Sequence, residues 1–348
     1  MLSRWSGSFQ IAAVYVGTVV GAGFATGKEI LEFFTQYGFY GFIGVLIAGY
    51  MFIFTGTKMM LLSSRAGAAT YEDFNRYLFG KKIAPIVNVI FLLMLLGVTS
   101  VMISGAGAVF EEQLGASKNT GIVITIILAS IVLILGIKGL FAVNSFVVPV
   151  MIFFSLMLCF FAIKGGGFVD SFLKLPEENL NWKMFLSPFA YIAFNLGLSQ
   201  AVLVPVAHEI GDEQTIRNGG ILGGIFLTTI LLSGHCALIS LPDASIYEIP
   251  TAELIKNGAA NFYWIFILVV YGEIFTSLIG NIFGLQRQIS RTFTHIPNIV
   301  IVLSIFFITY IVGRIEYGRL LGFLYPSFGY ISMLFLFLVW KKKLKEDI

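Results

Sequence analysis

The chain has 348 residues, of which 57% are hydrophobic and 12% are charged, and its formal net charge is +3. Its mean hydropathy is +0.90, whereas a soluble domain has about 25% charged residues. This composition excludes a water-soluble fold and predicts an integral membrane protein. The small net charge, without a basic stripe, argues against nucleic acid as a partner. Cys159 and Cys236 lie in apolar runs without disulfide or metal spacing, and no cleavable signal peptide is evident.

Long apolar stretches predict about ten membrane-spanning helices, because each crossing needs about 20 mostly apolar residues. We expect these spans at residues 8–36, 38–62, 84–112, 120–137, 140–163, 184–210, 218–241, 260–286, 297–313 and 319–340. The linkers are short, which predicts a single transmembrane domain over residues 1–348. Residues 69–82, between the second and third spans, are amphipathic and predict a short helix on the membrane surface.

Lysine and arginine residues favour one orientation in the membrane, because cytoplasmic loops carry an excess of both. With the N-terminus inside, 14 of the 22 Lys and Arg residues fall on the cytoplasmic side and 8 on the outer side. The basic segment at residues 341–345 agrees, since it meets anionic lipid at the inner leaflet. We therefore expect a multi-pass protein of the bacterial cell (inner) membrane with both termini in the cytoplasm.

The first and sixth predicted spans contain residues that disfavour helix near their middles. These are Gly17, Gly21, Gly23 and Gly27 in the first span, and Asn195, Gly197 and Pro205 in the sixth. The two spans are five apart, and five is odd, so a second set of five enters from the opposite side. The pattern predicts an all-α fold of two inverted five-helix repeats, about residues 8–163 and 184–340, with discontinuous helices 1 and 6. Alternatively, the glycines form small-residue packing seams.

The segment Gly17-Thr18-Val19-Val20-Gly21-Ala22-Gly23-Phe24 resembles the unwound first helix of the amino acid–polyamine–organocation superfamily, which has the LeuT-like fold. Within it the sequence is most similar to the bacterial YkvI-like membrane proteins. In size and span count it is also similar to the B subunits of spore germinant receptors. It lacks two features of some relatives, a mid-membrane lysine in span 5 and a glutamate after Gly197. Its solute therefore need not be theirs.

The resemblance implies an ion site and a solute site at the first helix. By that match, Gly17 and Val20 offer carbonyl groups to a sodium ion, and Thr276 and Ser277 complete the site with hydroxyl groups. The same match gives the backbone N–H groups of Ala22 and Gly23 to a substrate carboxylate.

The break itself indicates the same chemistry without the family. Unwinding exposes N–H groups, and the half-helix that we expect to start near Thr26 points its positive end at the gap. The carbonyl end of the preceding half-helix suits a cation. The substrate-binding candidates, from the broken spans and from span 3, are Gly21, Ala22, Gly23, Phe24, Ser100, Ser104, Tyr191, Phe194, Asn195 and Gly197. For any single aromatic residue or serine in this set, ordinary packing is the alternative.

Two ionisable residues inside predicted spans are candidates for proton coupling. Glu273 is costly at bilayer depth and should face a partner or a water-filled cavity, and Thr276 and Ser277 share its helix face. His235 lies in the outer half of span 7, within possible reach of Glu273. The alternative for both is an inert buried side chain whose polar atoms are satisfied by neighbours.

These features favour a secondary active transporter, not an enzyme, because no metal-ligand cluster or nucleophile–base set is readable. We expect cation-coupled symport of a small amino acid or related organic solute by alternating access. No cofactor is expected, and sodium is favoured over the proton as coupling ion. The alternative is a ligand-sensing membrane receptor subunit that resembles the germinant receptor B subunits and binds its solute without net transport.

Overall fold

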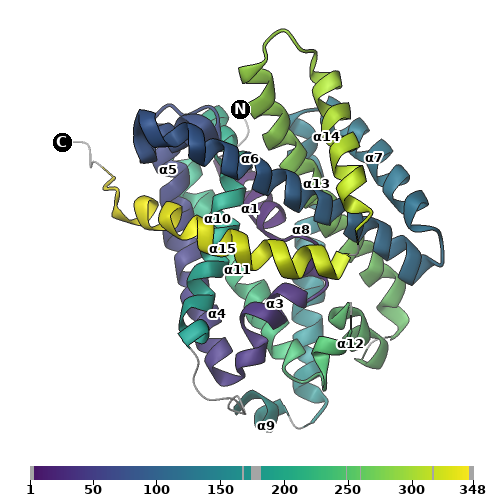
Figure 1. The fold of residues 1–348 in the computed structure, drawn as a ribbon. Coiled ribbons are helices and arrows are strands. Elements are labelled where there is room, and N and C mark those ends of the chain that lie inside the picture. The colour runs from purple at the N-terminus through teal and green to yellow at the C-terminus, as the bar shows by residue number, and fades with distance from the viewer. Residues whose placement is uncertain are drawn as a thin grey trace.

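The computed structural model describes residues 4–166, 168–173, 182–247, 249–258, 260–315 and 317–344, which form helices and no strands. In chain order, its elements are α1 Arg4–Val19, α2 Ala22–Ala25, α3 Lys28–Phe33, η1 Thr35–Tyr37, α4 Phe39–Met51, η2 Phe52–Gly56, α5 Thr57–Arg65, α6 Tyr71–Leu114, α7 Lys118–Ile134, α8 Ile137–Lys164, α9 Phe168–Leu173, α10 Trp182–Ile210, α11 Glu213–Leu238, η3 Ala244–Ile246, α12 Pro250–Gly258, η4 Ala260–Phe262, α13 Tyr263–Thr292, α14 Asn298–Gly313 and α15 Tyr317–Lys341 (Figure 1).

The predicted spans coincide with these helices. Seven helical segments of the described chain are long and apolar enough to cross a membrane, and α7 and α14 are shorter apolar helices. The first predicted span corresponds to the interrupted series α1, α2 and α3. The second is one continuous rod, because a π-helical segment, η2, joins α4 to α5. The all-α membrane architecture is therefore confirmed.

The predicted break in the first span is confirmed and lies between Val19 and Ala22. The backbone N–H of Val20 still donates to Val16, but Gly21 is extended, with φ −117° and ψ −166°. The half-helix starts at Ala22, four residues before the expected position near Thr26. It is interrupted again at Gly27, whose φ of +85° favours glycine.

The predicted break in the sixth span is absent, which corrects that expectation. α10 runs from Trp182 to Ile210 and contains Pro188 and Pro205 within its helical course. Gly197 serves packing instead: a Cβ added there would lie 2.9 Å from both the Phe91 ring and the Ser332 hydroxyl. Glycine and proline are common in membrane helices for such reasons, so composition alone overstated the discontinuity.

The segment before the third span is a separate short helix, as predicted. α6 begins at Tyr71, where Thr70 and Asp73 form a capping box. At Gly80, φ is +76° and ψ is +168°, so the helix direction changes sharply there. The location of this short helix on the membrane surface stays a prediction.

The centre of the molecule is formed by α1 and α10. In the most apolar 18-residue stretch of α10, 94% of the residues are buried, compared with 28% in the corresponding stretch of Lys138–Lys164 in α8. α11 packs directly against α1, since a Cβ at Gly219 would lie 2.6 Å from Ile11 Cβ. Small residues permit this close approach of helices in lipid. Figure 1 shows α7 and α14 at the periphery.

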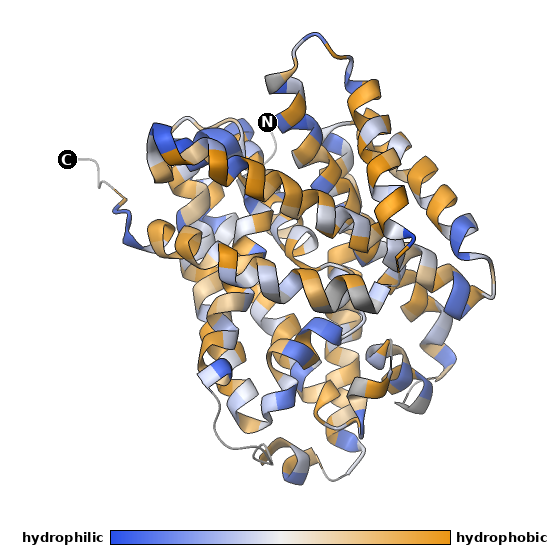
Figure 2. Cartoon of the chain, viewed as in Figure 1, coloured by the Kyte–Doolittle hydropathy of each residue, from blue (hydrophilic) through white to orange (hydrophobic). Residues whose placement is uncertain are grey.

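Exposed apolar side chains cover the outside of the helices. Examples on α6 and α7 are Ile86, Val89, Leu93, Ile127 and Ile131. Figure 2 shows hydrophobic residues along the helices, whereas hydrophilic residues concentrate near helix ends and connecting loops. A lipid environment explains this pattern, because it removes the cost of exposing apolar surface to water.

Polar contacts place the start of α1 and the end of α15 at one end of the bundle. Lys58 donates to the Trp340 carbonyl near the end of α15, and Ser8 Oγ near the start of α1 donates to the Thr215 carbonyl. At the same end, Arg65 forms a bidentate ion pair with Glu213, with both N···O distances 2.7 Å. These residues all come from the predicted cytoplasmic side or the adjacent start of α11, but the assignment of that end to the cytoplasm stays a prediction.

Candidate functional site

The broken first helix meets α13 through a cluster of oxygen atoms. Ser277 Oγ donates to the carbonyl of Gly17 at 3.0 Å and to that of Val20 at 2.5 Å. Thr276 Oγ1 lies 3.4 Å from the Gly17 carbonyl and 2.9 Å from the Glu273 carbonyl. The four residues predicted to hold sodium are therefore neighbours, and the Glu273 carbonyl adds a fifth oxygen.

The contacts have a structural cause in the helix break. Because α1 ends at Val19, its last carbonyl groups have no acceptor role within the helix. The two hydroxyl groups of α13 supply the missing donors across 259 and 260 residues of sequence. Thr276 and Ser277 are both buried, with exposed fractions of 0% and 2%. Hydroxyl and carbonyl oxygens at these distances offer several lone pairs to one hard cation, which prefers oxygen ligands.

The half-helix α2 has partners for its N–H groups inside the protein. The N–H of Ala22 donates to Met102 Sδ, 3.3 Å away. The N–H of Phe24 donates to the side-chain carboxylate of Glu29. The carbonyl of Gly23 accepts from Thr26 Oγ1 at 3.2 Å. The predicted carboxylate site at these amides is thus partly filled by groups of the chain itself.

A small cavity lies beside the break, between α1, α6, α10, α13 and α15. The cavity volume is about 20 Å³, which is enough for a water molecule but not for an amino acid. Its polar lining comes from Thr18, Glu29, Asn195, Ser277, Asn281 and Tyr325. Because Ser277 belongs both to this lining and to the oxygen cluster, the cavity and the candidate ion site are adjacent.

Three of the predicted substrate-binding residues lie at this cavity. Gly21, Phe194 and Asn195 line the cavity, and Phe194 packs on Tyr325 with ring centroids 4.5 Å apart. Glu29 is a lining residue that was not among the candidates chosen from the sequence. A carboxyl group within the apolar range 8–36 was the signal that would have found it.

Other predicted lining residues lie elsewhere. Ser100 Oγ donates to Leu96 and Ser104 Oγ to Ile315, so both hydroxyls bond to backbone carbonyls. α6 turns a different face to the cavity, and its lining residues are Val98 and Met102. Residues two positions apart point to very different sides of a helix, which explains the error.

The remaining candidates of span 6 have packing environments. Tyr191 lies among aromatic rings, with centroids 5.2 Å from Phe33 and 5.0 Å from Phe34, and its hydroxyl has no partner among the described residues. Gly197 faces Phe91 and Ser332, not the cavity. Neither residue touches the space where a solute could sit in this conformation.

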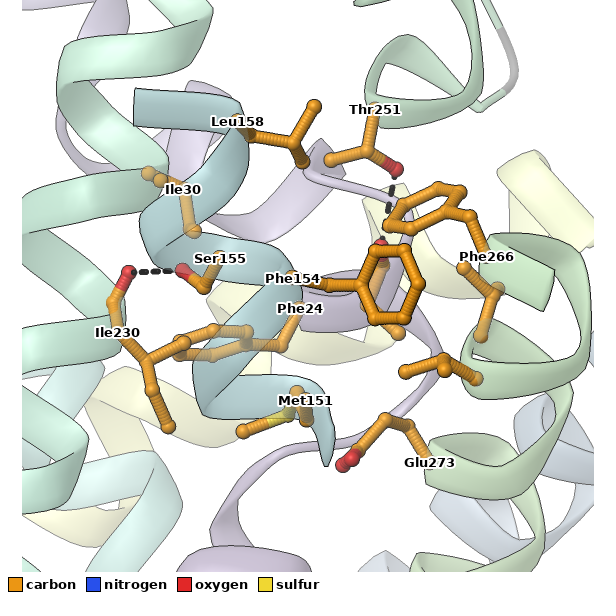
Figure 3. A pocket seen from close by; sticks show the side chains of 14 residues that line it. Phe24, Ile30, Met151, Phe154, Ser155, Leu158, Ile230, Thr251, Phe266 and Glu273 are labelled. Carbon is orange, nitrogen blue, oxygen red and sulfur yellow. Dashed lines mark hydrogen bonds between the residues drawn. The ribbon is translucent and has the colours of Figure 1, made fainter. Parts of the chain in front are cut away.

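Glu273 and Phe24 line a second cavity, on another face of the half-helix (Figure 3). Its walls are mostly apolar, and water centres fit in about 50 Å³. Glu273 lies at the opposite end from Thr251, with the rings of Phe154 and Phe266 between them. Both carboxylate oxygens of Glu273 lack hydrogen-bond partners among the described residues.

His235 does not meet Glu273. Its Nδ1 lies 3.2 Å from Thr35 Oγ1, and its ring packs near Phe172 with centroids 6.4 Å apart. The suggested hydrogen bond between Glu273 and His235 is therefore absent, because each side chain points into a different environment.

Solved structures with similar folds are membrane transporters. A complex of MhsT with L-phenylalanine superposes with a TM-score of 0.68 at 15% identity, covering 94% of this chain and 85% of that one. A Na⁺-coupled sialic acid symporter gives 0.68 at 11% identity, covering 97% and 79%. The nucleobase-cation-symport-1 family transporter Mhp1, with bromovinylhydantoin bound, gives 0.61 at 12%, covering 93% and 74%. These similarities show that the chain has the LeuT-like fold.

Sequence comparison identifies relatives of the same length. No family model matches the chain. The Bacillus subtilis protein YyaD, which is uncharacterized, is 22% identical over 330 residues, covering 94% of this chain and 95% of YyaD. The uncharacterized membrane protein YkvI of the same organism is 45% identical over 334 residues, covering 94% of this chain and 93% of YkvI. The chain belongs to the family of YkvI-like membrane proteins.

Proposed function

We propose that the protein is a secondary active transporter that couples the movement of a small organic solute, an amino acid or a related compound, to sodium. The observation that carries this proposal is the convergence of the Gly17 and Val20 carbonyls with the hydroxyls of Thr276 and Ser277. Solved neighbours of the same fold include a Na⁺-coupled symporter. The solute would bind in the adjacent cavity.

The ion site supports coupling because it joins two separate elements, the broken first helix and α13. Its carbonyls belong to the break in the first helix, and its hydroxyls belong to α13. A bound cation would replace the hydroxyl–carbonyl hydrogen bonds and would fix the unwound segment against α13. The solute cavity shares Ser277 with this cluster, so the shape of the cavity depends on the ion.

The size of the cavity supports alternating access. A cavity volume of about 20 Å³ is too small for an amino acid. The solute would therefore enter only after the surrounding helices separate. At one end of the bundle, Arg287 pairs with Glu209 and Arg291 pairs with Asp73. These contacts link α13 to α10 and α6 and would have to open when the site faces that side.

A thermal-shift measurement with purified protein tests the ion site. A ligand at 100 times its dissociation constant adds about 2.7 kcal/mol of stability, so sodium should raise the melting temperature relative to potassium. The double substitution Thr276→Ala and Ser277→Ala should remove this response. Ser100→Ala is the matched control, because that buried hydroxyl bonds only to the carbonyl four residues earlier. If the double variant keeps the full sodium response, the hydroxyls only cap α1 and the ion site is elsewhere.

Counterflow in liposomes separates transport from sensing. Proteoliposomes loaded inside with unlabelled solute should accumulate labelled solute from outside, since a carrier exchanges solute molecules across the membrane. A receptor that binds its ligand without transport would bind the label but would not exchange it. Binding without exchange would therefore contradict the transport proposal.

A further inference from the structure

Glu29 is a buried carboxylate inside the central cavity. It lies on α3, in the second part of the interrupted first helix, and only 2% of its surface is exposed. It lines the same cavity as Asn195, Ser277 and Tyr325. Glu29 is not one of the oxygen atoms of the candidate ion site.

The two oxygens of this carboxylate have different environments. One interaction is local, since the carboxylate accepts a hydrogen bond from the N–H of Phe24. Oε2 is buried and has no hydrogen-bond partner among the described residues. A carboxylate taken out of water costs several kcal/mol unless a counter-charge compensates it. None of the described residues that line the cavity is basic. The carboxyl group therefore stays neutral by holding a proton until a cationic ligand supplies the counter-charge.

The cavity walls indicate which kind of cation fits. Around Glu29 they include Phe194, Leu198, Met102 and the ring of Tyr325. Aromatic faces and one carboxylate suit an alkylammonium group, whose charge pairs with the acid while its carbon atoms contact apolar walls. Asn195 Nδ2 donates to the Tyr191 carbonyl at 3.0 Å, which leaves its amide oxygen as a second acceptor. The oxygen atoms of Thr18, Asn195 and Asn281 also line this cavity, so a metal ion is the competing occupant.

We propose that Glu29 binds the cationic amine of the transported solute. This assignment rests on the proposed transport function and specifies its substrate class as compounds with a protonated amine. A carboxylate on the solute is not required, because the chain's own Glu29 already occupies the N–H of Phe24 and Met102 accepts from Ala22. Decarboxylated amines therefore bind as well as the corresponding amino acids or better.

Matched ligands test this assignment by thermal shift in the presence of sodium. For each common amino acid, the panel holds three compounds with the same side chain: the amino acid, its decarboxylated amine and its deaminated acid. For leucine these are L-leucine, 3-methylbutylamine and 4-methylpentanoate. Amine-bearing members should stabilise the protein and deaminated acids should not. Glu29→Gln should weaken amine binding about tenfold or more, which corresponds to about 1.4 kcal/mol. Glu29→Asp, which keeps the charge, should retain part of the affinity.

Control measurements separate the possible failures. Glu32→Gln, which removes an exposed acid from the same helix α3, should leave amine binding unchanged. The sodium response of Glu29→Gln should persist, which shows that the variant is folded and that the ion site is independent. If no amine binds, or if only deaminated acids bind, the assignment of Glu29 is wrong while the sodium site stands. If Glu29→Gln loses the sodium response and keeps amine binding, Glu29 is an ion ligand and the assignment is also wrong. If sodium does not raise the melting temperature of the wild type, the proposed function is contradicted instead.

Discussion

Gly17 is the residue at which ion site and packing meet. A Cβ added there would lie 1.7 Å from Asn144 Oδ1 and 3.5 Å from Thr276 Oγ1. Asn144 is itself held by its Nδ2, which donates to the Leu140 carbonyl at 2.8 Å. The absence of a side chain at Gly17 therefore lets α8 and α13 approach the end of α1.

We predict that Gly17→Ala destabilises the protein by about 1–3 kcal/mol, the usual cost of overpacking a tight core, and weakens the sodium response. Thermal melting with and without sodium measures both effects. Gly165→Ala is the control, since its Cβ would meet only ordinary contacts at 3.5 Å and beyond, with φ −66°. An unchanged melting temperature and sodium response in Gly17→Ala would contradict the close packing at this position.

Glu273 provides a second test at the residue scale. Its carboxyl group lies in the apolar cavity of Figure 3, while its backbone carbonyl belongs to the oxygen cluster. Glu273→Gln keeps that carbonyl and nearly the same shape. We therefore predict that sodium-driven uptake by this variant equals that of the wild type in proteoliposomes. Loss of uphill uptake with retained exchange would show that the side chain carries a coupling proton.

At the scale of elements, the unbroken α10 changes how span 6 takes part. Gly197 packs against Phe91 of α6 and Ser332 of α15, whereas Phe194 and Asn195, three and two residues earlier, line the cavity. We predict that Gly197→Ala lowers stability by about 1–3 kcal/mol but leaves ligand affinity unchanged, as measured by melting and by ligand titration. A large loss of affinity with little loss of stability would restore the idea of a functional break here.

The sequence predicted helices better than it predicted which faces of them are functional. Apolar length located the spans, and the glycines of span 1 located a break that is present. Similar residues in span 6 predicted a break that is absent, since a glycine that unwinds a helix and a glycine that packs one look alike in sequence. Ser100 and Ser104 were selected for their spacing, but only packing decides which face of α6 turns inward. The position of Glu29 in the cavity lining is evident only from the packed structure.

For the whole molecule, polar contacts define one end of the bundle. Arg65 with Glu213 and Lys58 with Trp340 lie at the end that also holds the start of α1. α9 and α12 lie at the lower end of the view in Figure 1. The basic residues predict that the first of these ends is cytoplasmic.

Cysteine labelling in intact cells tests this topology in a background without Cys159 and Cys236, which are free in the structure. Lys82→Cys and Lys341→Cys should react with a membrane-impermeant reagent only after the cells are opened. Asp170→Cys, on α9, should react from outside. Labelling of Lys341→Cys from outside would show that the protein has the opposite orientation in the membrane. The ion pairs of Arg287 and Arg291 would then lie at the outer face.

In the proposed mechanism, a sodium gradient moves the solute through the site at the broken first helix. Each sodium that enters carries one charge, worth about 2.3 kcal/mol per 100 mV, but a proton would carry the same charge, so the ion itself must be varied.

The most direct measurement is uphill uptake, by proteoliposomes, of the amine-bearing compound that stabilises the protein best. We predict uptake under an inward sodium gradient, loss of that uptake in the double variant Thr276→Ala and Ser277→Ala, and no uphill uptake when a pH gradient replaces sodium. Uptake at full rate in sodium-free medium, driven by the pH gradient, would contradict sodium coupling.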